Sequence, residues 1–207
     1  MGTSRLETFA DGVFAIAATL LILNVRVDPS RCPALSCQIL HAWPSYVAYT
    51  VSFITMGIIW LNHHNVMRQI ARADRTFLMI TIVFLMIVAF IPFPTELVAE
   101  HIGGTFDDAQ AATVLYGITL TLTAVVFNIV WFYAVRGGRL LREDADPRVV
   151  RGISRTFVFG PWTYLALTII SVASPTVGAI GFALFALFWV IESSVFGRDR
   201  ISEPSEA

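Results

Sequence analysis

The chain consists of long uncharged stretches separated by short segments that carry most of its charges. A helix needs about 20 apolar residues to cross the ~30 Å hydrocarbon core of a bilayer. Pro44 would lie in the first turn of the second stretch, where proline is accepted, and Pro92 and Pro94 would close the third. The pattern therefore predicts membrane-spanning helices at about 5–27, 42–65, 76–95 and 109–135.

The last uncharged stretch, 156–191, contains 36 residues. As one helix it would be about 54 Å long, which exceeds the thickness of a bilayer core. Ser174-Pro175, with Gly178 shortly after, predicts a break near its middle. We therefore expect two further spans, at about 156–173 and 176–196. The predicted fold class is an all-α polytopic membrane protein, with six transmembrane helices in one domain (1–200) and a short polar tail (201–207).

Composition supports the membrane assignment. Hydrophobic residues make up 56% of the chain and charged residues only 14%, whereas soluble domains carry about a quarter charged residues. An ordinary soluble enzyme is excluded on that ground. No nucleophile–base pair or metal triad is visible at helical spacing, so we expect neither an enzyme nor a metal site. The net charge of −1 gives no basic field for a nucleic-acid partner.

The positions of the arginines predict the orientation. All but two of the 14 basic residues, every one of them arginine, would lie on the same side of the membrane as the N-terminus. Only Arg26 and Arg31 would lie on the other side. By the positive-inside rule, both ends of the chain are cytoplasmic. A cleaved signal peptide is disfavoured, because Glu7 and Asp11 would fall in its basic start and no small-residue cleavage site follows.

The first predicted span carries most of the candidate chemistry. Ser4 and Glu7 have the spacing of a capping box, which predicts a helix start there. Asp11 would point at a neighbouring span or be solvated at headgroup depth, because a carboxylate in a membrane usually faces protein or water. At 100° per residue, one helix face is shared by Phe9, Gly12, Ile16, Leu20 and Leu23, with Thr19 beside it.

Three motifs in the first three spans resemble a known family. The sequence Arg5-x-x-x-Phe9-Ala10-Asp11 resembles the RxxxFSD signature of the transmembrane protein 175 family, which comprises endolysosomal potassium channels and smaller bacterial relatives. Ala10 stands where that family has serine, so one hydroxyl of its helix-tying network is missing. The two further motifs are Tyr49-x-x-Ser52-Phe53 with Trp60-x-x-His63, and Phe90-Ile91-Pro92-Phe93-Pro94-Thr95.

The resemblance implies a homotetramer in the lipid bilayer of a bacterial plasma membrane, conducting potassium in preference to sodium. The first helices would surround a central pore, with Ile16 as its hydrophobic constriction and Leu20 and Leu23 continuing its wall. Thr19 would contribute hydroxyls to the ion pathway. No cofactor is implied besides the permeant potassium ion. A network that ties the helices together would contain Arg5, Phe9, Asp11, Trp60 and His63.

Of two alternatives, one is disfavoured and one stays open. Thr113-Val-Leu-Tyr116-Gly117 resembles the carbonyl filter of ordinary potassium channels, but it lies inside an uncharged run, where helical carbonyls are already bonded. The other is a secondary transporter, or proton-linked permease, that would use Asp11, His63 and His64. Transporters tend to show paired repeats and broken helices, and neither is evident in the sequence.

The two cysteines, Cys32 and Cys37, are expected on the outer side, where a disulfide can form. With His41 they resemble a metal pair only faintly, because a zinc site needs about four ligands.

Overall fold

The computed structural model describes residues 3–30 and 32–196, with side chains up to Val190. Its described part is all-α, as predicted, and its one non-helical pairing is an isolated bridge between Ile70 and Leu141. The elements, in chain order, are α1 (Ser4–Leu20), the short η1 (Leu21–Asn24), α2 (Leu35–His41), α3 (Trp43–Met67), α4 (Arg75–Phe90), α5 (Pro92–His101), α6 (Phe106–Val135), η2 (Arg136–Gly138), α7 (Pro147–Ala173) and α8 (Pro175–Phe196).

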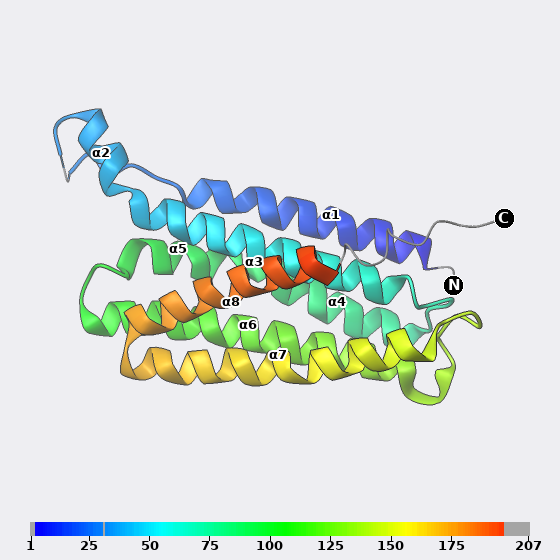
Figure 1. The fold of residues 1–207 in the computed structure, drawn as a ribbon. Coiled ribbons are helices and arrows are strands. Elements are labelled where there is room, and N and C mark those ends of the chain that lie inside the picture. Colours follow the sequence, from blue (N-terminus) through cyan, green and yellow to red (C-terminus); the bar gives the residue numbers. More distant parts are fainter. Residues whose placement is uncertain (1–2, 31, 197–207) are drawn as a thin grey trace.

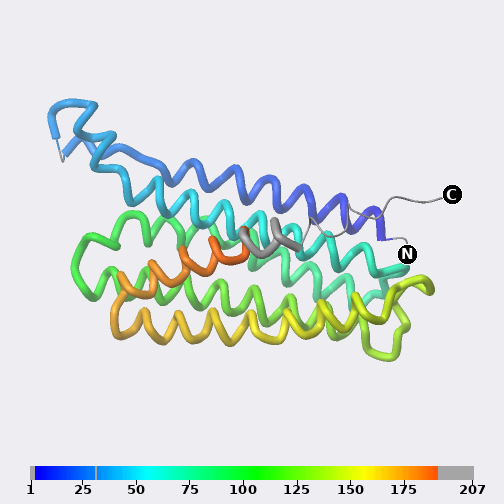
Figure 2. Tube along the Cα trace, viewed as in Figure 1, coloured from blue at the N-terminus to red at the C-terminus, as the bar shows by residue number. Residues whose placement is uncertain are grey.

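The helices form an elongated bundle in which α1 and α7 lie at opposite edges (Figure 1). The start of α1 and the α3–α4 and α6–α7 connections gather at one end, and the α5–α6 and α7–α8 turns lie at the other (Figure 2). The first of these ends is called the arginine-rich end below, because it carries Arg68, Arg72, Arg75, Arg136, Arg139 and Arg142.

The centre of the bundle is filled by α4 and α6, which pack against each other and together contact α1, α5, α7 and α8. Phe84, Val88, Val130 and Trp131 are fully buried there. Large side chains occupy the axis of the bundle, and their burial stabilises the packing of the helices around it. A water-filled path through the middle of one chain is therefore blocked.

Several helices are long enough to cross a bilayer. Within the described residues, five helical segments have the required length and apolarity, and Pro175–Val190 is a shorter apolar helix. The five are Ser4–Asn24, Trp43–Met67, Arg75–His101, Phe106–Gly138 and Pro147–Ala173. The predicted tail (201–207) lies outside the described residues.

Helix ends differ from the prediction where prolines and charges occur. Pro92 and Pro94 do not close the third span: α5 begins at Pro92 and carries the segment on to His101. Proline fits the first turn of a helix, since its missing N–H would have no partner there. In the same way α7 begins at Pro147, not at 156, and the Asp146 side chain accepts a hydrogen bond from the Arg148 N–H.

The first helix begins at the predicted residue, but it lacks the predicted cap and its segment ends earlier. α1 begins at Ser4, but no side chain caps it, and Glu7 instead contacts His64, with 3.2 Å between Oε1 and Nδ1. At the other end the segment stops at Asn24, not at 27. The buried Asn24 amide donates to the Pro92 carbonyl oxygen at 2.8 Å, which fixes the end of η1 against the start of α5.

Two connections are joined at the arginine-rich end. The Ala71 N–H donates to the Leu140 carbonyl oxygen at 2.9 Å, next to the isolated bridge. Asp74 caps α4: its Oδ1 accepts from the Phe77 N–H at 2.8 Å and its Oδ2 from the Tyr133 hydroxyl at 2.8 Å. These two bonds, the backbone N–H first, hold the pKa of the Asp74 carboxyl below its ordinary value.

Candidate ion pathway on the first helix

The first helix has one face inside the bundle and one face outside it. Leu6, Ala10, Phe14 and Ala17 are buried, on a helix that packs against α3 and α4. The opposite face is apolar and uncovered: the exposed fractions are 63% for Ile16, 43% for Leu20 and 61% for Leu23. The three share a face by helical geometry, and nothing in the described part of this chain covers them.

Thr19 lies beside this exposed row and is itself exposed. Its hydroxyl donates to the Ile16 carbonyl oxygen at 2.8 Å. Because the proton is used within the helix, the threonine oxygen presents lone pairs outward. The group can therefore accept a hydrogen bond from water or contact a cation, but it cannot donate to a ligand in this rotamer.

Two polar contacts tie α1 to α3 at the arginine-rich end. The Trp60 indole N–H donates to Oδ1 of Asp11 at 2.9 Å. One turn of α1 away, Glu7 contacts His64, whose ring stacks on Trp60 with 6.1 Å between ring centroids. Asp11 thus points to a neighbouring span, away from the Ile16 row, as its place around the helix predicts.

His63 lies behind these contacts and is only 1% exposed. Its ring stacks on Phe84, with 5.8 Å between centroids and 8° between planes, and lies 5.7 Å from the ring of Phe14. Neither ring nitrogen has a hydrogen-bond partner in the described structure. His63 therefore joins α1, α3 and α4 by ring packing and not by hydrogen bonds.

The expected helix-tying network is thus only partly brought together by hydrogen bonds. Asp11 and Trp60 are bonded, and His63 packs nearby. Arg5 and Phe9 are both exposed, and neither side chain forms a hydrogen bond or ion pair with another residue of the described chain. Ala10, where the family signature has serine, is fully buried and supplies packing alone.

The comparisons with known proteins identify the family of this chain. The sequence model of the family described as "Endosomal/lysosomal potassium channel TMEM175" matches residues 5–92. A potassium channel of Chamaesiphon minutus is 40% identical over 176 residues, covering 82% of this chain and 86% of the relative. This protein belongs to the TMEM175 channel family. It is accordingly a membrane channel protein and not an enzyme.

The fold of the TMEM175 family is matched over nearly the whole chain. The crystal structure of a lysosomal potassium-selective channel TMEM175 homolog from Chamaesiphon minutus superposes with a TM-score of 0.83 at 33% identity, covering 92% of this chain and 97% of that one. A more distant relative, the endosomal/lysosomal proton channel TMEM175 of Gallus gallus, is 30% identical over 138 residues, covering 62% of this chain and 28% of its own length.

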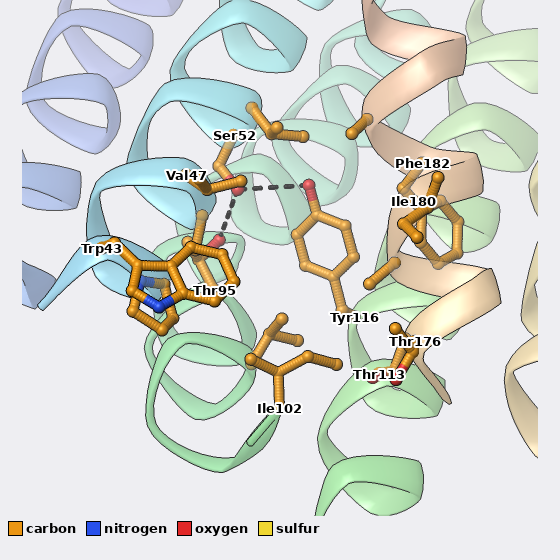
Figure 3. A pocket seen from close by; sticks show the side chains of 16 residues that line it. Trp43, Val47, Ser52, Thr95, Ile102, Thr113, Tyr116, Thr176, Ile180 and Phe182 are labelled. Atoms are coloured by element: carbon orange, nitrogen blue, oxygen red, sulfur yellow. Dashed lines mark hydrogen bonds between the residues drawn. The ribbon is translucent and has the colours of Figure 1, made fainter. Parts of the chain in front are cut away.

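The filter-like sequence of the fourth span belongs to the helical interior of the bundle. Thr113 and Tyr116 are buried inside the continuous helix α6. The Ser52 hydroxyl oxygen lies 3.1 Å from the Tyr116 hydroxyl and 2.9 Å from that of Thr95 (Figure 3). The Thr95 hydroxyl donates to the Ile91 carbonyl oxygen. The Ser52 hydroxyl therefore donates to Thr95, and the Tyr116 hydroxyl donates to Ser52. All three donors are used inside the protein.

These hydroxyls form the polar wall of an otherwise apolar cavity of about 370 Å³ between α3, α5, α6 and α8, with Trp43, Val47 and Phe182 among its other walls (Figure 3). The hydroxyl chain was not predicted from the sequence, although Ser52 and Thr95 lie in two of the family-like motifs. The available signal was that hydroxyl groups interrupt apolar runs, since such groups need partners inside a membrane.

The two cysteines form a disulfide, with 5.9 Å between the Cα atoms of Cys32 and Cys37. Nδ1 of His41 lies 3.6 Å from the first sulfur and 3.5 Å from the second. The three residues are gathered closely enough to be considered as metal ligands. The thiolate is the form of cysteine that binds metal, and the sulfurs of a disulfide are not thiolates. Of the two alternatives, the structure contains the disulfide.

Proposed function

We propose that this protein is a potassium channel of a bacterial plasma membrane, which conducts potassium in preference to sodium. Four copies surround one pore, and each contributes α1 to its wall. Both chain ends are cytoplasmic, as the arginine distribution predicts. The proposal is supported by the potassium-channel names of the Chamaesiphon relative and of its solved homolog.

The observation that carries the proposal is the uncovered apolar row on α1. The helix lies at the edge of the bundle (Figure 1), so this row is free to meet other copies. The axis of a single chain is filled by Phe84, Val130 and Trp131, and an ion path must therefore lie between chains. A ring of four Ile16 side chains, with Leu20 and Leu23 next to it, gives such a path a narrow apolar segment.

An apolar ring controls ion flow through hydration. Isoleucine side chains offer no group that replaces the water around an ion, so a narrow ring can close by losing its water. When the ring is wide enough to conduct, potassium sheds part of its hydration more easily than the smaller sodium ion. Selectivity without a carbonyl filter is therefore modest, and the outward lone pairs of Thr19 add to it.

The rival function is a proton-linked transporter, which needs a chain of groups that pass protons. Asp11 accepts a hydrogen bond from Trp60, while neither ring nitrogen of His63 is bonded within the described structure. Asp11, His63 and His64 are therefore not connected by hydrogen bonds into a relay. At the break between α4 and α5, the Asn24 amide donates to the Pro92 carbonyl oxygen.

The test compares two isoleucines of equal exposure. Ile16 and Ile169 are each 63% exposed, but Ile169 lies on α7, at the opposite edge of the bundle (Figure 1). Purified Ile16→Asn in liposomes is expected to leak more potassium at rest and to discriminate less between potassium and sodium in reversal-potential measurements. Ile169→Asn is expected to leave both properties unchanged, because its side chain faces lipid.

If Ile16→Asn changes neither property, α1 does not line the narrowest part of the path and the proposal fails. Single-channel recording separates the two functions, since a transporter gives no unitary current steps. Light scattering of the purified protein tests the assembly: the proposal requires the mass of four 22.9 kDa chains.

A further inference from the structure

A groove lies on the surface between α6 and α7. Helix α7 is at the edge of the bundle opposite α1 (Figure 1). The volume of the groove is about 560 Å³. Its floor and walls are almost entirely apolar, and Trp162 is its most exposed member, at 68%. Arg136 lies at one end. The apolar side chains that line it are Val125, Ile129 and Phe132 from α6, and Val158, Pro161 and Trp162 from α7.

The length of the groove corresponds to one leaflet of a bilayer. On α6, Val125, Ile129, Phe132 and Arg136 follow one another at helical spacing along one face. The eleven-residue step from Val125 to Arg136 is about 16 Å at 1.5 Å per residue. Half of a ~30 Å hydrocarbon core is about 15 Å. The groove thus reaches from the headgroup region to the middle of the membrane.

The antiparallel helix α7 repeats this order of residues. Val158 and Trp162 share a face with Arg155, which lies one turn nearer the arginine-rich end than Val158. The α7 wall of the groove is therefore also apolar toward the membrane centre. Arg155 lies about level with Trp131, whose indole N–H donates to the neighbouring Ser154 hydroxyl, so Arg136 alone marks the end of the groove.

The positive charge at that end is not neutralised by the protein. Arg136 and Arg155 are exposed, and neither forms an ion pair within the described residues. Asp74, which contacts the groove residue Tyr133, is occupied: it accepts from the Tyr133 hydroxyl and the Phe77 N–H, and it pairs with Arg139. Arg136, the arginine that lines the groove, therefore remains available to an anion from outside.

We propose that this groove binds one anionic phospholipid of the leaflet at the arginine-rich end. Its phosphate pairs with Arg136, and one acyl chain extends along the apolar walls to Trp162. Basic groups beside a membrane-facing apolar surface favour anionic headgroups in this way. A second copy of the chain is a poorer occupant, because the face proposed to meet other copies lies on α1, across the bundle.

The test uses Trp162 as a reporter of the acyl chain, because brominated lipid chains quench tryptophan fluorescence on contact. The full-length protein is reconstituted in phosphatidylcholine vesicles containing phosphatidylglycerol, with bromine on the chains of one lipid or the other. The protein contains five tryptophans, so Trp162→Phe defines the contribution of this site. Brominated phosphatidylglycerol is expected to quench that contribution at a several-fold lower mole fraction than brominated phosphatidylcholine.

Two variants that each remove one positive charge make the result specific. Arg136→Gln is expected to weaken the preference for phosphatidylglycerol about fivefold, the value for one arginine at a membrane surface. Arg142→Gln removes a charge from the same end, but Arg142 pairs with Asp144 and lies outside the groove, so it should keep the preference.

Three results overturn the proposal. If both lipids quench equally, the groove does not select charge. If neither quenches the Trp162 contribution, a protein surface covers the groove. If Arg142→Gln weakens the preference as much as Arg136→Gln, the attraction comes from diffuse surface charge and not from a site.

Discussion

Replacing His63 with methionine is expected to make the protein more stable. A neutral imidazole has one N–H donor and one acceptor nitrogen, and both nitrogens of His63 are buried without partners. A buried polar atom left without a hydrogen bond destabilises a protein by about 1–3 kcal/mol. Methionine removes both atoms and places a thioether against the rings of Phe14 and Phe84, a favourable contact.

The size of the effect follows from these terms. The stability gained by removing two unpartnered polar atoms is partly offset by the imperfect packing of methionine. For a substitution of similar volume, imperfect packing costs less than about 1.5 kcal/mol. The expected net gain is about 2 kcal/mol, which in a protein of this size raises the Tm by about 4–8 °C. The Tm is followed by the change of intrinsic tryptophan fluorescence on heating, in detergent at fixed protein concentration.

His64 provides a matched control at the next position. Its side chain is 41% exposed and contacts Glu7 at 3.2 Å, and exposed ion pairs contribute only about 0–1 kcal/mol. His64→Met should therefore lower the Tm slightly or leave it unchanged. A His63→Met variant that melts below the parent would refute the reasoning, because it would mean that the ring nitrogens are hydrogen-bonded in the membrane, for example by a buried water.

Two further predictions concern a helix contact and a cap. Gly178→Ala should destabilise the α7–α8 hairpin by about 1–3 kcal/mol, because the new Cβ would overlap the Ser171 hydroxyl and lie 2.9 Å from its Cα. Gly152→Ala, where a Cβ meets no atom within 4 Å, should stabilise α7 by about 0.5–1 kcal/mol, and the Tm values of the two variants test both statements. The pKa of Asp74 is lower in the folded protein than its ordinary value of 3.8. The ionised carboxylate therefore stabilises the fold above pH 3.8, and this stabilisation is lost as the pH falls through the folded-state pKa. Asp74→Asn should flatten the decline of Tm with pH in that acidic range.

The positions of the helices could be predicted from the sequence, but several of their ends could not. An uncharged run shows which segment of the chain can lie inside the membrane, because this depends only on the local composition. Where a helix stops depends on the backbone. Pro92 and Pro147 both begin helices, and whether a proline begins or ends a helix depends on the hydrogen bonds around it. Charged residues such as Arg148 can also continue a helix beyond the apolar region.

Part of the candidate site could likewise be predicted from the sequence, and part could not. The Ile16, Leu20 and Leu23 row follows from the helical repeat alone, so the sequence predicts it correctly as one face. The partner of Asp11 was suggested by the family resemblance, since nothing local connects it with Trp60. The hydroxyl chain of Tyr116, Ser52 and Thr95 joins residues 64 and 43 positions apart, and no repeat within one helix predicts such a meeting.

The contacts of α1 explain why its apolar row points away from the bundle. An apolar helix has no strong preference for one face, since lipid and protein interior are both apolar. Its rotation must therefore be set by polar or shape-specific contacts. Asp11 bonds to Trp60 near the start of the segment, and Asn24 bonds to the Pro92 carbonyl oxygen at its end. Both bonds lie outside the row itself. Together they fix the rotation of the helix at two points and leave Ile16 on its uncovered face.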